Sequence, residues 1–122
     1  MQLFESEMQI LKLLWQEGEL TAKEIAMILE EKVGWKKTTT YTVIKKCISK
    51  GIVMKKDPHY ICVPLISKEE VQREKADELI KDVFDGSIDN FFAAFVSGKK
   101  LSEENVHFLE KLINEYKDEE DQ

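Results

Sequence analysis

The sequence contains few of the residues that build disulfide scaffolds, metal centres and turn-rich folds. Its 122 residues include two cysteines, two histidines, two prolines and five glycines. Cys47 and Cys62 lack the spacing of metal ligands, and two thiols are too few for a disulfide framework. We therefore expect two small buried side chains in a reducing compartment, with no metal site and no cofactor.

Sequence signatures of catalysis and of membrane insertion are also missing. The sequence has no HExxH motif, no glycine-rich phosphate loop and no Ser/His/Asp order, and its histidines are His59 and His107. No apolar run approaches the roughly 20 residues that span a bilayer. The first residues lack the basic region of a signal peptide. We predict a cytoplasmic protein that is not an enzyme and has no membrane partner.

Charge is distributed unevenly along the chain, whose formal net charge is −6. Residues 1–66 carry 10 basic and 8 acidic side chains, whereas residues 67–122 carry 8 basic and 16 acidic ones. The stretch from Trp35 to Lys56 contains seven lysines and no acid. A local excess of positive charge is what binding to a polyanion requires. The alternative is a lysine-rich face that only contacts solvent.

Capping residues and apolar periodicity predict three short helices in residues 1–66. Ser6 with Gln9 forms the pattern of a capping box at the start of the first helix, and Thr21 with Glu24 repeats it for the second. A third helix is predicted from Thr38 to Lys50, followed by a glycine.

A β-hairpin is predicted after the third helix. Two β-prone runs, residues 52–54 and 60–63, flank a spacer that contains Lys55, Lys56 and an Asp-Pro turn signal. Three short helices followed by a hairpin with a basic tip is the element order of a winged helix-turn-helix domain. The predicted fold class is therefore mainly α with a small hairpin wing, and this domain is predicted to cover residues 1–66.

Residues 67–122 are predicted to form a separate domain of three helices. Ser67 with Glu70 opens a helix to about Phe84, a second helix covers residues 88–96, and Ser102 caps a third. Their apolar side chains are too numerous for one small core, so we predict a homodimer with a symmetric interface. Packing against the first domain is the alternative. The predicted dimerisation residues are Phe91, Phe92, Phe95, Phe108, Leu109, Leu112 and Ile113.

The third predicted helix has one apolar face and one face of hydroxyl and ammonium groups. At 100° per residue, Thr40, Val43, Ile44, Cys47 and Ile48 fall together and are predicted to pack inward. The outward residues include no carboxylate, in contrast to an ordinary solvated helix. They are Thr38, Thr39, Tyr41, Thr42, Lys45, Lys46 and Ser49.

This outward chemistry suits double-stranded DNA. Hydroxyl groups bond base edges or phosphates, and a threonine methyl group contacts the thymine methyl group. Lysines contact phosphates, which supports affinity more than sequence discrimination. We predict that Lys55 and Lys56 of the wing contact the neighbouring phosphate backbone. For Thr38 the alternative is a purely capping role.

Several ordered motifs carry a resemblance to a known family. They are Trp15-Gln16-Glu17-Gly18 with Leu20 to Ile25, Thr39 to Thr42 with Lys50-Gly51, Tyr60 to Leu65, and Ala93 to Val96 with Leu101 to Glu104. In this order and spacing the chain resembles the penicillinase-repressor family (BlaI/MecI type). The resemblance covers nearly the whole chain.

The resemblance implies a homodimeric winged-helix transcriptional repressor. Such repressors bind an inverted-repeat operator with TACA/TGTA-type half-sites, and they control β-lactam-resistance or related stress genes. By the same resemblance, a sensor-linked protease is a further partner. The family's contacts fall here on Thr38, Thr39, Tyr41, Thr42, Lys46 and the wing lysines.

The sequence departs from the family pattern in three places. Pro58 stands where many relatives have a wing arginine, and no cysteine follows Cys62, which excludes the four-cysteine copper site of one branch. The Asn-Phe bond that is cleaved in the β-lactam-responsive branch falls here on Ala94-Phe95, and Asn90-Phe91 lies one turn earlier. A winged-helix module for a protein partner and a ligand-sensing regulator are the alternative functions.

Overall fold

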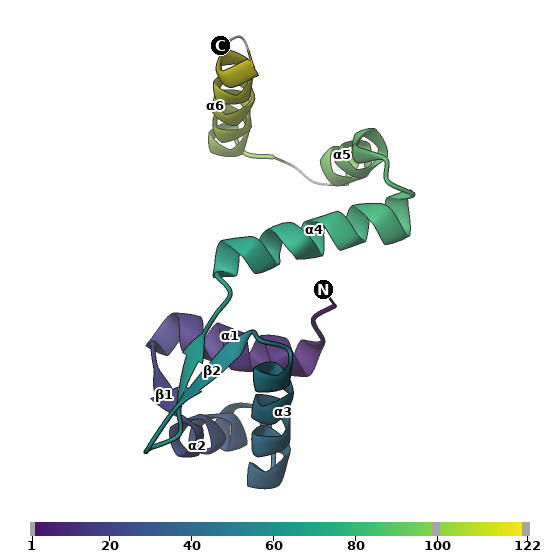
Figure 1. The fold of residues 1–122 in the computed structure, drawn as a ribbon. Helices are drawn as coiled ribbons and strands as arrows, with labels where there is room; N and C mark the ends of the chain where they lie inside the picture. Colours follow the sequence, from purple (N-terminus) through teal and green to yellow (C-terminus); the bar gives the residue numbers. More distant parts are fainter. Residues whose placement is uncertain (1, 99–100, 121–122) are drawn as a thin grey trace. The chain divides into compact units, whose positions relative to one another are not determined.

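Six helices and three short strands form the part of the chain that the structure describes, residues 2–98 and 101–120 (Figure 1). The structure is a computed structural model, and its mainly helical class with a small sheet is the predicted one. The elements are α1 (Glu5–Glu17), β1 (Leu20–Thr21), α2 (Ala22–Val33), α3 (Lys37–Ser49), β2 (Val53–Lys56), β3 (Ile61–Pro64), α4 (Lys68–Phe84), α5 (Ile88–Ser97) and α6 (Glu103–Glu120).

The chain divides into two compact units, Met1–Asp77 and Glu78–Gln122. The first unit includes the start of α4, because Val71 is buried in its core. In addition, the Trp15 indole Nε1–H donates to the Ile66 carbonyl at 3.0 Å. The compact first unit thus extends further along the chain than residue 66, where the composition changes. The assignment of DNA binding and dimerisation to separate domains stays a prediction.

Side chains cap the helices at most of the predicted places. Thr21 Oγ1 accepts the Glu24 N–H, and the Glu24 carboxylate accepts the Thr21 N–H, both at 3.1 Å.

The predicted cap of α1 was wrong. Ser6 lies inside that helix, whose N-cap is Phe4, and the Glu7 carboxylate accepts the Phe4 N–H at 2.9 Å. A glutamate three residues after the N-cap satisfies this N–H without a capping hydroxyl.

The predicted caps of the later helices are confirmed. Ser67 Oγ accepts the Glu70 N–H at 3.1 Å at the start of α4. Ser102 Oγ accepts the Asn105 N–H at 3.0 Å at the start of α6. The backbone N–H groups in the first turn of a helix have no partner within the helix, and these hydroxyl oxygens accept hydrogen bonds from them. The two helices therefore begin at defined residues.

A three-stranded antiparallel sheet of order β1-β3-β2 completes the first unit. The hairpin of β2 and β3 was predicted, but β1 was not, because two residues are too few to show strand alternation. Leu20 of β1 pairs with Cys62 of β3. Lys55 and Lys56 are the last residues of β2, and residues 57–60 form the tip. The prediction that these lysines form the tip was therefore wrong by one or two positions.

The core of the first unit lies between α1, α2, α3 and the sheet. Apolar side chains from each of these elements are buried there, and α4 adds Val71. Removing this apolar surface from water is the main stabilising contribution. The buried residues of this core cluster are Leu3, Ile10, Leu11, Leu13, Leu14, Ala22, Ile25, Leu29, Val43, Ile44, Cys47, Ile52, Val53, Cys62 and Val71.

An ion pair with a buried carboxylate joins α1 to the residue that follows α3. Glu7 is 1% exposed, and one of its carboxylate oxygens lies 2.7 Å from Lys50 Nζ. Lys50 also donates to the Gln2 carbonyl at 3.0 Å and lies 4.5 Å from the centroid of the Phe4 ring. Burial alone would raise the pKa of Glu7, but the hydrogen bonds from Lys50 and the Phe4 N–H hold it below the ordinary value of 4.5.

This ion pair predicts a pH-dependent contribution to stability. Glu7→Gln keeps the shape but removes the charge, and it should lower the free energy of unfolding at neutral pH by about 1–3 kcal/mol. The folded-state pKa of Glu7 is lowered, so its contribution is present above pH 4.5 and is lost as the pH falls through that lowered value. Urea denaturation at several pH values measures the difference between wild type and variant.

Glu5→Gln is the matched control, because Glu5 is an exposed carboxylate in the same helical turn. It should change the free energy of unfolding by a few tenths of a kcal/mol at all pH values. An effect of Glu7→Gln that stays constant down to low pH would show that the ionisation of Glu7 does not carry its contribution to stability.

Candidate nucleic-acid interface

Helix α3 has the buried and exposed faces that its sequence predicts. Thr40, Val43, Ile44 and Cys47 are buried, and Ile48 is packed partly against the core. Its predicted start was one residue late, because α3 begins at Lys37. Contacts of this face with α1 and α2 fix the orientation of the helix. The opposite face is therefore directed to solvent.

The exposed face of α3 presents hydroxyl and ammonium groups without a carboxylate. Thr38, Thr39, Thr42, Lys45 and Lys46 are all exposed, as predicted. Within the described part of the chain, neither of these lysines forms an ion pair. Their positive charge is therefore available to an anionic partner.

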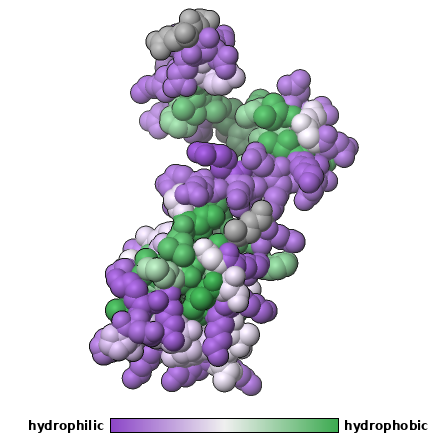
Figure 2. Space-filling view, in the orientation of Figure 1, coloured by the Kyte–Doolittle hydropathy of each residue, from purple (hydrophilic) through white to green (hydrophobic). Residues whose placement is uncertain are grey.

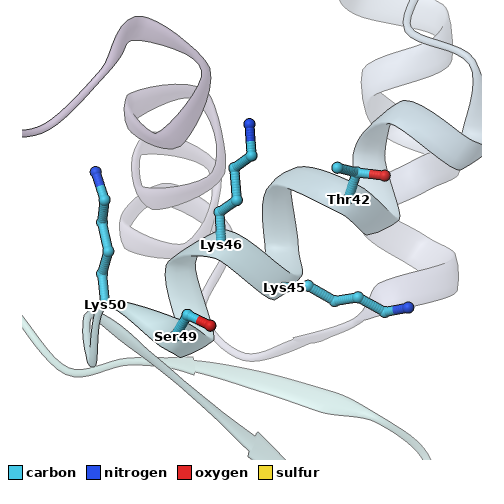
Figure 3. A pocket seen from close by; sticks show the side chains of 5 residues that line it. All are labelled: Thr42, Lys45, Lys46, Ser49 and Lys50. Carbon is cyan, nitrogen blue, oxygen red and sulfur yellow. The ribbon is translucent and has the colours of Figure 1, made fainter.

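A shallow pocket of about 390 Å³ lies on this face and is drawn in Figure 3. Thr42, Lys45, Lys46, Ser49 and Lys50 line it. Lys45 and Lys46 extend from the helix in different directions, so their ammonium groups do not converge on one point. This spacing suits contacts along an extended polyanion better than the coordination of a single small anion.

The exposed threonines differ in what their hydroxyl groups already bind. Thr42 Oγ1 donates to the Thr38 carbonyl at 2.9 Å, so its hydrogen is used within the helix. The N-cap of α3 is Lys36, which has no side-chain capping bond, so Thr38 does not cap the helix. The capping alternative for Thr38 is thus wrong. The hydroxyl groups of Thr38 and Thr39 form no hydrogen bond with another described residue.

Tyr41 connects the helix to the sheet. Its ring is half-buried and contacts the Tyr60 ring edge-on, with centroids 5.9 Å apart. Lys55 Nζ lies 4.3 Å from the centroid of the Tyr60 ring. Burial raises the pKa of the Tyr60 hydroxyl above its ordinary value of 10.0. The half-buried ring of Tyr41 therefore links α3 to the residue that precedes β3.

The wing lysines are each close to an acid. Lys56 Nζ lies 3.2 Å from a Glu19 carboxylate oxygen, and Lys55 Nζ lies 3.6 Å from one of Asp57. All four side chains are well exposed, so these pairs are weak and compete readily with other anions. The sequence did not predict this pairing, because Glu19 lies far away along the chain and Asp57 falls just outside the acid-free stretch.

The two cysteines are free thiols in the core, as predicted. Burial raises the pKa of Cys47 to about 12 and that of Cys62 to about 11. Both thiols are therefore protonated and unreactive at neutral pH. Among the described residues no group of His, Cys, Asp and Glu side chains could hold a metal ion. No helix of these residues is long and apolar enough to cross a membrane.

The second unit exposes much of its apolar surface (Figure 2). Phe91 is half-buried, with its ring 5.6 Å from that of Phe84. The predicted dimerisation residues Phe92, Phe95, Phe108, Leu112 and Ile113 are exposed by 37–61%, and Leu109 is half-buried. Their use in a dimer stays a prediction.

The position that corresponds to the cleaved bond of the β-lactam-responsive branch lies within α5. Ala94 and Phe95 are both exposed, and Asn90 lies in the first turn of the same helix. A helical bond must unfold locally before it enters the extended binding cleft of a protease.

Comparisons with known proteins agree with this description. The family model described as penicillinase repressor matches residues 3–115. A penicillinase repressor from Bacillus licheniformis is 20% identical over 118 residues, which cover 95% of this chain and 92% of the relative.

The fold has a counterpart among solved structures. The solution structure of the DNA binding domain of the repressor BlaI is similar with a TM-score of 0.51 at 20% identity. The match covers 57% of this chain and 87% of that domain. The chain therefore belongs to the penicillinase repressor family, and its first unit has a winged-helix fold.

Proposed function

We propose that this chain is a DNA-binding transcriptional repressor that acts as a homodimer on an inverted-repeat operator. The observation that carries the proposal is the exposed face of α3, where hydroxyl and ammonium groups stand without a carboxylate. Its family resemblance supports TACA/TGTA-type half-sites and control of β-lactam-resistance or related stress genes. Operator DNA is the main partner, and a sensor-linked protease is a further one.

In this proposal the N-terminal half of α3 enters the major groove. Thr38 and Thr39 offer hydroxyl groups to base edges, and Thr42 offers its methyl group because its hydroxyl hydrogen is already bound within the helix. Lys45 and Lys46 contact phosphates. Lys55 and Lys56 contact the adjacent DNA backbone. Phosphate groups then replace Asp57 and Glu19 as the partners of these lysines.

Dimerisation serves DNA recognition as well as stability. One winged-helix unit contacts few base pairs, whereas two linked units raise the affinity through effective concentration and require a palindromic site. The exposed aromatic side chains of α5 and α6 are suited to a symmetric interface, because they would bury apolar surface that is now in water.

Thr39 and Thr42, two of the exposed threonines of α3, should respond to substitution in opposite ways. Thr42→Ser removes the methyl group and should lower discrimination at its base pair by about 1–3 kcal/mol, whereas Thr42→Val should change it little. Thr39→Val removes a free hydroxyl group and should lower discrimination, whereas Thr39→Ser should retain it. Affinities for the operator and for duplexes with single base changes measure these effects. Equal losses on specific and random DNA would assign both residues to phosphate contact.

Salt dependence should distinguish the helix lysines from the wing lysines. The log–log slope of affinity against salt scales with the number of phosphates that the protein neutralises, at about 0.9 per phosphate, so Lys46→Gln should reduce its magnitude by about that amount. Lys56→Gln should reduce it less, because Glu19 already offsets part of its charge. Glu19→Gln should strengthen binding. Affinity that does not change with salt on any duplex would contradict DNA binding.

Charge placed on α6 should dissociate the dimer. Phe108→Glu changes a side chain that is 61% exposed, and in a symmetric interface the change acts twice. Loss of the burial of two phenylalanine side chains, at about 1.5–3 kcal/mol each, should weaken dimerisation more than a hundredfold. Sedimentation equilibrium measures this. Met27→Glu, which changes an exposed apolar residue of α2, is the control that should leave the dimer intact.

A further inference from the structure

A groove of about 730 Å³ lies in the first unit, between α1 and the start of α4. Its volume is in the range of about 300–1,000 Å³ that is usual for small-molecule sites. None of its lining residues belongs to the predicted DNA interface. They are Met8, Lys12, Trp15, Gln16, Lys68, Val71, Gln72 and Lys75.

The floor of the groove is apolar and packs against the core. Val71 is 1% exposed, while Met8 and Trp15 are half-buried against the core. The Trp15 Nε1–H is held by the Ile66 carbonyl at 3.0 Å, so the indole ring has a fixed orientation. A flat ring that packs against this floor would replace water at a large apolar surface.

The rim of the groove is positively charged. Its lining, which consists of described residues, includes three lysines and two glutamines but no carboxylate. Lys75 already donates to the Leu3 carbonyl. Lys12 and Lys68 form no ion pair with any described residue, so an anion in the groove would meet two uncompensated ammonium groups.

We propose that this groove is a binding site for a small aromatic carboxylate. The aromatic part packs on Trp15 and Met8, and the carboxylate accepts from Lys12 and Lys68, with Gln16 and Gln72 as further donors. An inorganic anion would leave the apolar floor in water, and a neutral aromatic compound would leave the ammonium groups without a partner. The proposal does not depend on DNA binding, so each can fail without the other.

Tryptophan fluorescence can report on the groove directly. The chain has two tryptophans, so Trp35→Phe leaves Trp15 as the single emitter in the full-length protein. The probe is 4-biphenylacetate, and 2-(4-biphenylyl)ethanol is its neutral counterpart. We expect a saturable change of Trp15 emission with the carboxylate, and weaker binding of the alcohol.

Substitution of the lysines should separate the charged probe from the neutral one. Lys12→Gln and Lys68→Gln should each weaken binding of the carboxylate by up to about fivefold, as expected for an exposed ion pair. Binding of the alcohol should change less than binding of the carboxylate does. Lys23→Gln, an exposed lysine of α2 outside the groove, is the matched control and should have no effect.

Three results would overturn the proposal. They are equal affinities for the carboxylate and the alcohol, a change in emission that does not saturate, and equal effects of all three lysine substitutions. The indole N–H signal of Trp15 in the NMR spectrum of the unsubstituted protein provides a second measurement. It should shift with 4-biphenylacetate more than the Trp35 signal does, and the absence of this shift would also contradict the proposal.

Discussion

The position of α3 depends on a buried carboxylate that comes from another helix. Glu7 is the one charged side chain that is buried among the described residues, and its partner Lys50 follows directly after α3. A buried charge without a partner is costly, so the two groups constrain each other. The apolar face of α3 determines which side of the helix points inward, and this ion pair ties its C-terminal end to α1. Lys50 thus belongs to the scaffold, although by sequence it is one of the seven lysines of the basic stretch.

The sequence predicted those features that repeat within one element. The buried face of α3 follows from the spacing of Val43, Ile44 and Cys47, and the capping box of α2 follows from Thr21 and Glu24. Features that join distant residues were not predictable in this way. The pair of Glu7 and Lys50 and the pair of Glu19 and Lys56 connect residues that lie far apart in the chain. Strand β1 was missed because its two residues are defined only by their pairing with β3.

These long-range pairs change the interpretation of the basic surface. Judged from the sequence, all seven lysines of the stretch contribute equally to the positive charge of the surface. In the structure, however, Lys50 is neutralised by Glu7, and each wing lysine has an acid within 4 Å. The uncompensated charge of the candidate interface is therefore concentrated on α3. A helix that carries both the hydroxyl groups and the free ammonium groups combines sequence discrimination with affinity in one element. The net charge of −6 does not oppose this, because 16 of the 24 acids lie after residue 66.

Helix α1 is common to the two sites of the first unit. One turn provides Glu7, which holds Lys50 at the end of α3, and the next residue, Met8, lines the proposed ligand groove. On the other side of that groove lies the start of α4, the helix that continues into the second unit. Proximity alone does not couple two sites, because a ligand shifts an equilibrium only by its difference in affinity between two states. A ligand in the groove would therefore change DNA binding only if α1 or α4 adopts different positions in the free and the DNA-bound repressor. A change in the position of α1 relative to the start of α4 would alter the width of the groove, because each helix forms one of its walls.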